Sequence, residues 1–401
     1  MVTPEFNLLV RACGRARKLP LFEISETTRH KPAIDEKLFV RLAFQHKVAA
    51  TALTGMKMLG QNLQPEHSQK LKQYALQAKI LRALILEGAG VITEALSKAG
   101  IPSIVLKGPA SSLQLYGDAL TREYTDLDIL INLPAVDTAI PIMSTLGYEA
   151  ADYQPAKNAR FKGSRLIARG HHVVFWKKGS PFRVELHDRS GWERELFARD
   201  NIDEVFDRAV RLEQEGRAFY SPALPDHAAL IIAHGTQHAW TLLHWLLDAA
   251  ALAACDNTGM QKDIADRICA LDMQCQFKLA YELTRKLFPI ELPQALKLSI
   301  GCKAPLEKSV AFAFARLQTG AGDISTMKNM FAFRFTYASP LFKTAKGKFT
   351  SAARLFQIPL QDAEALPLPR PLLFLHLFLR PFFVMSRRLK RILKRRSDAH
   401  E

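Results

Sequence analysis

The hydrophobic period of this sequence changes abruptly at Gly100, and no other feature limits the fold as strongly. Between about Glu36 and Ala99 the apolar residues recur at helical spacing, which predicts two or three helices. Gly100 is a typical helix C-terminus, Pro102 follows it, and the run SIVL (103–106) has the composition of a short buried strand. A helix that leads into a strand is typical of folds that combine the two.

Helix and strand patterns alternate after this strand. PASSLQLYG (109–117) is a short helical piece, and TDLDILINL (125–133) alternates and has enough β-branched residues to form a strand. Residues 134–146 have the pattern of a further helix. HHVVFW and FRVELHD flank a KKGSP turn, so residues 171–188 are predicted to form a β-hairpin. We therefore expect an α+β core, a small mixed sheet with helices.

Helical patterning returns as one long stretch between Asp226 and about Cys255, and it continues to about Leu317. Beyond Gly320 the sequence becomes Phe-rich and basic. A chain of 401 residues is too long for a single ordinary core, so we expect more than one domain. The proposed division is an N-terminal helical segment (1–75), the α+β core (76–215), a helical domain (216–320) and a C-terminal tail (321–401).

Cysteine usage and hydropathy limit the compartment. The five cysteines are odd in number and scattered, without the short paired spacings of a zinc site or a disulfide framework. The N-terminus has no long apolar segment typical of secretion, and no stretch of roughly 20 uncharged apolar residues suggests a membrane span. We expect a cytoplasmic protein.

The charge of the chain favours anionic partners. The formal net charge is +16, and seven of the ten residues from Arg387 to Arg396 are basic. Nucleotide phosphates, nucleic acid and an acidic lipid surface all fit such a balance. Residues 372–396 join a short apolar run to this basic run, and could lie on an anionic membrane surface, peripheral to the inner membrane. The alternative is a core-packing helix followed by a solvated basic tail.

Two aspartates in the strand TDLDIL form the first candidate site. Asp126 and Asp128 lie at i and i+2, so both carboxylates emerge on one face of the strand, while Leu127 points into the core. Adjacent carboxylates repel one another unless a cation lies between them, which indicates ligands for a hard metal such as Mg²⁺. The alternative is a solvated strand end.

The surrounding residues suit phosphate chemistry. Gly108 removes a Cβ where backbone N–H groups would approach a phosphate, and the helix that follows favours anions at its N-terminus. Lys107 or Arg122 could neutralise developing charge. In RVELHD, Glu185 is the candidate third carboxylate and His187 lies on the same face. The alternative for these two is the polar face of a hairpin strand.

A histidine pair lies in the later helical stretch. His234 and His238 are at i and i+4 on one helical face, which is also the spacing of a two-histidine metal site, but there is no HExxH motif. Asp248 lies about 15 Å further along the helix on a neighbouring face. These residues could line the cleft or an acceptor pocket, form core or interdomain hydrogen bonds, or hold a second metal.

The segment SIVLKGPASSLQLYGDALTREYTDLDILI, followed by RVELHD, resembles the bacterial uncharacterised nucleotidyltransferase family, a branch of the polymerase-beta-like nucleotidyltransferase superfamily. The later H-x3-H-x-W segment ending in an aspartate and the Pro-Leu-rich tail are also similar, so the likeness covers about residues 35–385. The superfamily usually has Gly-Ser after the first strand, whereas here Lys107-Gly108-Pro109 matches this branch and lacks the serine hydroxyl.

The resemblance implies the polymerase-beta-like fold and transfer of a nucleoside monophosphate from an NTP to an acceptor hydroxyl, with two Mg²⁺ ions. Asp126 and Asp128 match the metal-binding aspartates, and Glu185 matches the third acidic position. Three other readings stay open: a non-catalytic NTP-binding or regulatory protein of the same fold, a nucleic-acid-binding protein, and a membrane-surface accessory of polysaccharide assembly. The base, the acceptor and the pathway are not indicated.

Overall fold

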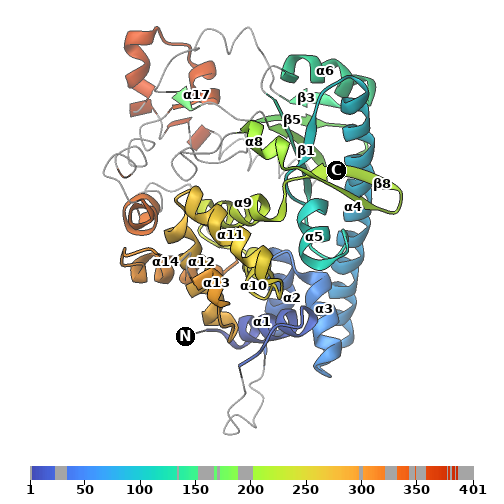
Figure 1. Ribbon diagram of the computed structural model, residues 1–401, viewed down its shortest axis with the longest axis vertical. Coiled ribbons are helices and arrows are strands. Elements are labelled where there is room, and N and C mark those ends of the chain that lie inside the picture. The colour runs from blue at the N-terminus through green and yellow to red at the C-terminus, as the bar shows by residue number, and fades with distance from the viewer. Residues whose placement is uncertain are drawn as a thin grey trace.

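A computed structural model of the chain has an α+β architecture, with a small mixed sheet set among many helices (Figure 1). It describes residues 2–22, 34–132, 135–151, 167–168, 172–187, 202–297, 301–320, 332–342 and 358–376, with Lys348 and short stretches between 378 and 386.

The central sheet has five strands in the order β1-β2-β6-β5-β3. Strands β2 and β6 run parallel, and the other neighbours are antiparallel. The strand predicted at 103–106, the strand with the two aspartates and the hairpin at 171–188 are all confirmed. Their bounds are β1 Ser103–Val105, β2 Asp126–Ile131, β3 Glu149–Ala151, β5 His172–Trp176 and β6 Arg183–His187.

Helices cover both faces of this sheet. Leu127, Ile129 and Ile131 of β2 are fully buried in a cluster with α4 (Pro65–Lys98) and α6 (Val136–Thr145), so the predicted inward face of the strand is confirmed. On the opposite face, Leu130 packs with residues of α8 (Ile202–Asp207) and α9 (Leu224–Gln237). Because α8 and α9 pack against β2 at Leu130, the beginning of the strand at Asp126 is left available for a site.

The N-terminal helices share a hydrophobic core with the later helices rather than with the sheet. In Figure 1 helices α1 to α3 lie beside α10 at one end of the molecule. The expected helices between 36 and 99 are confirmed as three. The helices of this layer are α1 Pro4–Ala16, α2 Glu36–Gln45, α3 Ala49–Met58, α9 Leu224–Gln237, α10 Leu243–Ala253, α11 Thr258–Ala270, α12 Gln274–Leu287, α13 Gln294–Lys297 and α14 Glu307–Leu317.

Two features of the middle of the chain differ from the sequence prediction. The stretch from Asp226 to Cys255 is not one continuous helix, because Ala239 and Trp240 take positive φ angles of 51° and 52° between α9 and α10. This turn buries the Trp240 ring against Gly235, where a Cβ would overlap it. An antiparallel hairpin of β7 (Val210–Gln214) and β8 (Arg217–Ser221) was also not predicted.

The cysteine prediction is wrong for one pair. Cys275, at the beginning of α12, forms a disulfide with Cys302, 27 residues later. The two positions have no short spacing in the sequence, so the pairing comes from the tertiary structure. Cys13, Cys255 and Cys269 are free thiols.

The C-terminal region is described only in part. Short elements occupy Ala332–Ala338, Ser339–Leu341, Leu360–Ala365 (α17) and Arg370–Leu375, and the two short strands β4 (Ile167–Ala168) and β9 (Ile358–Pro359) pair in parallel. Phe378 and Phe382 are 72% and 67% exposed. The basic run from Arg387 to Arg396 lies outside the described residues. Within the described chain, no helix combines the length and the apolar character that a membrane crossing requires.

Candidate functional site

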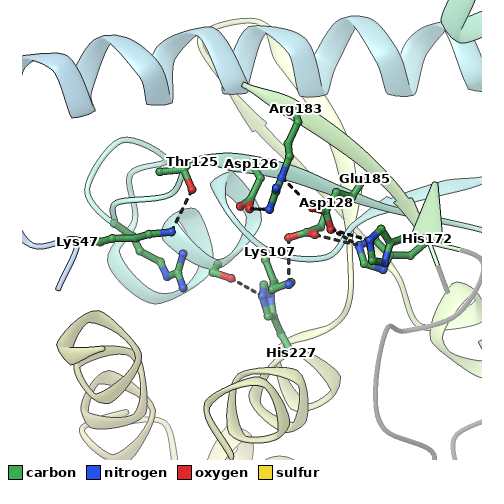
Figure 2. Close-up of polar contacts among 12 residues, drawn as sticks. Lys47, Lys107, Thr125, Asp126, Asp128, His172, Arg183, Glu185 and His227 are labelled. Carbon is green, nitrogen blue, oxygen red and sulfur yellow. Dashed lines mark hydrogen bonds and ion pairs between the residues drawn. The ribbon is translucent and has the colours of Figure 1, made fainter. Parts of the chain in front are cut away.

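The site is built on the parallel pair β2 and β6. In this register Asp126 is opposite Arg183, and Asp128 is opposite Glu185. Residues paired across neighbouring strands point to the same face, so the two carboxylates project together. The antiparallel pairing of β1 with β2 places Lys107 beside them, because Leu106 donates its backbone N–H to the Asp128 carbonyl at 3.0 Å. Five polar side chains, from β2, from β6 and from the residues just after β1, therefore gather at one place (Figure 2).

Asp128 is the buried centre of this group, with 5% of its surface exposed. Lys107 Nζ lies 3.1 Å from its Oδ2, and His187 donates from Nε2 to its Oδ1 at 2.9 Å. Burial opposes a charge on Asp128, but the ammonium and the imidazole N–H outweigh it and hold the pKa of this carboxyl well below its usual range. Asp128 is therefore ionised at every physiological pH.

Glu185 is held in a different way. Arg183 Nε lies 2.9 Å from its Oε1, and His187 and His172 approach its Oε2 at 3.7 and 3.8 Å. Burial, and then the charge of Asp128, raise the pKa of Glu185. Burial also lowers the pKa of His172 to about 4, so this ring is neutral at pH 7. The two carboxylates repel one another, and a cation between them would relieve that repulsion.

The donor set fits a metal ion. Ligand atoms of Asp128, Glu185 and His187 all lie within 4.8 Å of one another. Two carboxylate oxygens and one imidazole nitrogen are ligands that a divalent cation accepts, although Mg²⁺ itself prefers oxygen. If a cation replaced the Nε2 proton that His187 donates to Asp128, the ligand atoms of Asp128, Glu185 and His187 would already lie close together. The sequence placed His187 on this face but did not assign it to the metal.

Asp126 lies next to this cluster rather than in it. It is the less buried of the two aspartates, and its Oδ2 lies 3.3 Å from Arg183 Nη2. Arg183 thus bridges the two carboxylates, because its Nη2 contacts Asp126 and its Nε contacts Glu185. The guanidinium occupies the space between these two carboxylates, so Asp126 would reach a metal shared with Glu185 only after Arg183 moves.

The profile of the uncharacterised nucleotidyltransferase family matches residues 32–289, well over half of the chain and all of the site just described. The chain belongs to this family. Neither the curated proteins nor the solved structures include a significant match. The resemblance inferred from the motifs is therefore confirmed at the level of the family.

The family match extends into the helical layer. This layer contacts the helix that follows Gly108 through His227. This buried residue of α9 bonds to Gln114 through Nδ1 at 2.9 Å and to Ser111 through Nε2 at 2.7 Å. Burial lowers its pKa to about 3, so the ring is neutral. The Gln114 Oε1 atom can only accept, so Nδ1 carries the proton, and the Ser111 hydroxyl donates to Nε2. Both partners lie on α5 (Pro109–Tyr116), the helix that begins after Gly108.

Arg122, which was predicted to neutralise phosphate charge, forms an ion pair with Asp248, which was predicted to line the cleft or an acceptor pocket. Arg122 donates from Nε to Asp248 Oδ2 at 2.7 Å, and Tyr116 donates its hydroxyl to Asp248 Oδ1 at 2.8 Å. Arg122 and Asp248 are both buried. Asp248 thus contacts the loop before β2, and the Arg122 guanidinium faces this carboxylate.

His234 and His238 remain neighbours at the end of α9. Their ring centroids are 4.6 Å apart, and both rings contact Trp245 at 5.2 and 5.3 Å. Burial, followed by the charge of Lys107, lowers the pKa of His234 well below its usual value. His234 is therefore a neutral ring near enough to Lys107 to respond to its charge.

Some contacts of the site have no signal in the sequence. The alternation in RVELHD predicts that Arg183 shares the face of Glu185 and His187, and the structure agrees, but nothing in the sequence indicates that Arg183 pairs with Asp126. His227 and Lys47 come from segments remote in sequence, and no local pattern pairs them with α5 or β2.

Proposed function

We propose that this protein is a metal-dependent nucleotidyltransferase, which moves a nucleoside monophosphate from an NTP to an acceptor hydroxyl. The observation that carries the proposal is the cluster of Asp128, Glu185 and His187 beside Lys107, in a chain of this family. The order β1-β2-β6-β5-β3, with one parallel pair at the carboxylates, supports a polymerase-beta-like core.

Mg²⁺ is the proposed cofactor, with two ions as the superfamily resemblance implies. Asp128 and Glu185 would hold one ion together with His187, and Asp126 would take part in holding the other once Arg183 turns to a phosphate. Bound Mg²⁺ would polarise the phosphate oxygens and neutralise their charge. Lys107, Gly108 and the N-terminus of α5 would position the phosphates.

The proposed reaction is an in-line displacement at the α-phosphorus of the NTP. The acceptor oxygen forms a bond to the α-phosphorus, the bond to the bridging β-phosphate oxygen breaks, and pyrophosphate leaves. Glu185 would help to take the hydroxyl proton. Arg122 would then act as a positioning residue through Asp248, rather than as the phosphate ligand expected from the sequence.

The acceptor side of the cleft would be formed by the helical layer. His234 and His238 at the end of α9 pack against Trp245 of α10, and burial keeps the His234 ring neutral. Together with His187 they would contact the acceptor.

The experiment that tests this function measures binding and turnover of each of the four NTPs with Mg²⁺. Pyrophosphate release with a cell-extract acceptor pool is compared between the wild type and the variants Asp128→Asn and Glu185→Gln. Glu66→Gln, an exposed carboxylate of α4, is the matched control. We expect metal-dependent release that falls by about 10²–10³-fold in the two site variants and is unchanged in the control.

A non-catalytic NTP-binding protein of the same fold is the second candidate, and the Arg183 bridge between Asp126 and Glu185 favours it. Mg²⁺-dependent NTP binding without pyrophosphate release from any acceptor pool would support this candidate and contradict the transferase. An absence of NTP binding would contradict both.

A further inference from the structure

Lys47 reaches the candidate site from the N-terminal helices. It follows the last turn of α2 and has a φ of 54°, the left-handed region that a lysine rarely adopts. The backbone N–H of Lys47 donates to the Phe44 carbonyl at 3.0 Å, and that of Val48 donates to Ala43 at 2.9 Å. These bonds terminate the helix and hold Lys47 in its unfavourable conformation, which fixes the direction of its side chain.

The N-terminal helices also hold the loop that leads into β2. Arg17 of the α1 C-cap donates from Nη2 to the Thr121 carbonyl at 2.9 Å. The backbone N–H of Ala50, in the first turn of α3, donates to Glu123 Oε1 at 2.7 Å. Lys47 lies between these two anchors in the sequence, so its position relative to β2 is fixed on both sides.

The side chain of Lys47 ends at the beginning of β2. Its Nζ donates to Thr125 Oγ1 at 3.0 Å, and Thr125 immediately precedes Asp126 (Figure 2). Among the described residues, no carboxylate forms an ion pair with this ammonium within 4.0 Å. Its hydrogen-bond partner is therefore a neutral hydroxyl.

The anion nearest to Lys47 in its electrostatic surroundings, Asp126, is already paired with another cation. Burial lowers the pKa of Lys47, the charge of Asp126 raises it, and the charges of Arg122, Lys107 and Arg183 lower it again. Asp126 is already paired with Arg183, and Lys107 with Asp128. A partly buried ammonium near other cations is unfavourable unless a further anion neutralises it.

We propose that Lys47 binds a phosphate oxygen of the nucleoside triphosphate, so that the N-terminal helices supply part of the polyphosphate site. The ligand class rests on the proposed function, because the candidate metal site lies on the same strand. Lys47 would contact the phosphates from the turn after α2, whereas Lys107 would do so from the turn after β1.

The test compares Lys47→Met with Lys47→Arg, and uses Lys57→Met as the matched control. Lys57 is an exposed lysine of α3 in the same helical layer. The probes are inorganic tripolyphosphate and each of the four NTPs, with Mg²⁺, measured by titration calorimetry at two salt concentrations. Thermal unfolding checks that each variant is folded.

We expect Lys47→Met to weaken binding of tripolyphosphate and NTP by about 10-fold or more, and to reduce its salt dependence. Lys47→Arg should stay within about 3-fold of the wild type, because it keeps the charge. Lys57→Met should have no effect. Equal binding by the wild type and Lys47→Met would overturn the inference, and so would an absence of binding in the wild type. Binding that depends on Lys47 without pyrophosphate release would uphold the inference and overturn only the proposed transfer.

Discussion

Arg122 and Asp248 are 126 residues apart in the sequence, and their side chains meet at 2.7 Å. The pair joins the loop before β2 to α10, and so connects the sheet to the helical layer. Tyr116 occupies the second oxygen of Asp248, so both carboxylate oxygens have a partner. Burial opposes the charge of Arg122, but the field of Asp248 and their hydrogen bond raise the pKa of the guanidinium. The contact is therefore a charged pair that depends on both members.

Asp248→Ala should strongly destabilise the protein, because it leaves the buried Arg122 charge without a partner. The expected loss in the free energy of unfolding is about 3–5 kcal/mol, measured by urea denaturation. The double variant Arg122→Met/Asp248→Leu should recover most of this loss, because it removes both charges. Glu94→Gln, which removes a fully exposed pair with Lys98, is the control and should change stability much less. Equal effects of Asp248→Ala and Glu94→Gln would contradict this account.

His227 should make the stability depend on pH. Its folded pKa is about 3 and its ordinary value is 6.5, so between these values the unfolded chain binds the additional proton. The stabilisation is present above about pH 6.5 and is lost as the pH falls toward 3, by about 1.4 kcal/mol for each pH unit. We expect the difference in unfolding free energy between wild type and His227→Gln to shrink over this range. The other buried histidines, such as His172 and His234, are unchanged in both proteins, so their contributions cancel. A difference that is independent of pH would contradict the neutral, buried ring.

Gly108→Ala should impair nucleotide binding. Gly108 has a φ of 65° and a ψ of −116°, which an L-residue rarely adopts, and a Cβ there would lie 3.4 Å from Tyr124. The turn would have to change, and with it the direction of α5. We expect a loss of about 1–3 kcal/mol in stability and at least 10-fold weaker NTP binding. Gly179→Ala, at a φ of 79° in open space in the β5–β6 turn, is the control: it should lose stability but keep NTP binding. Weaker binding in both variants would point to a general effect of destabilisation.

The tail should bind anionic bilayers if residues 372–396 are a membrane-surface segment. Phe378 and Phe382 are exposed, and the sequence continues into seven basic residues among ten. We expect the full chain to co-sediment with vesicles that contain anionic lipid, more weakly at high salt, and Phe378→Ser/Phe382→Ser to lose most of this binding. Leu76→Ser/Ile80→Ser removes exposed apolar residues of α4 and is the control. Equal binding of both double variants, or none by the wild type, would contradict a membrane role.

The strands around the site, and the face of each strand on which its polar residues lie, follow from the amino-acid sequence alone. The alternation of TDLDIL places Asp126 and Asp128 on one face of β2, and the same period places Glu185 and His187 together on β6. These features follow from local periodicity, which is set by the backbone geometry of a strand or helix. The family could be identified for the same reason, since its motifs are short and continuous in the chain.

Which of these faces meet depends on the packing of the whole fold. The register of β2 with β6 brings Asp128 opposite Glu185 and turns Arg183 toward Asp126. The packing of the helical layers pairs Arg122 with Asp248 and brings Lys47 to Thr125. Such contacts join residues far apart in the chain, and their partners are chosen by burial and charge neutralisation over the whole core. Periodicity specifies the direction of a side chain, but not the segment that it will face.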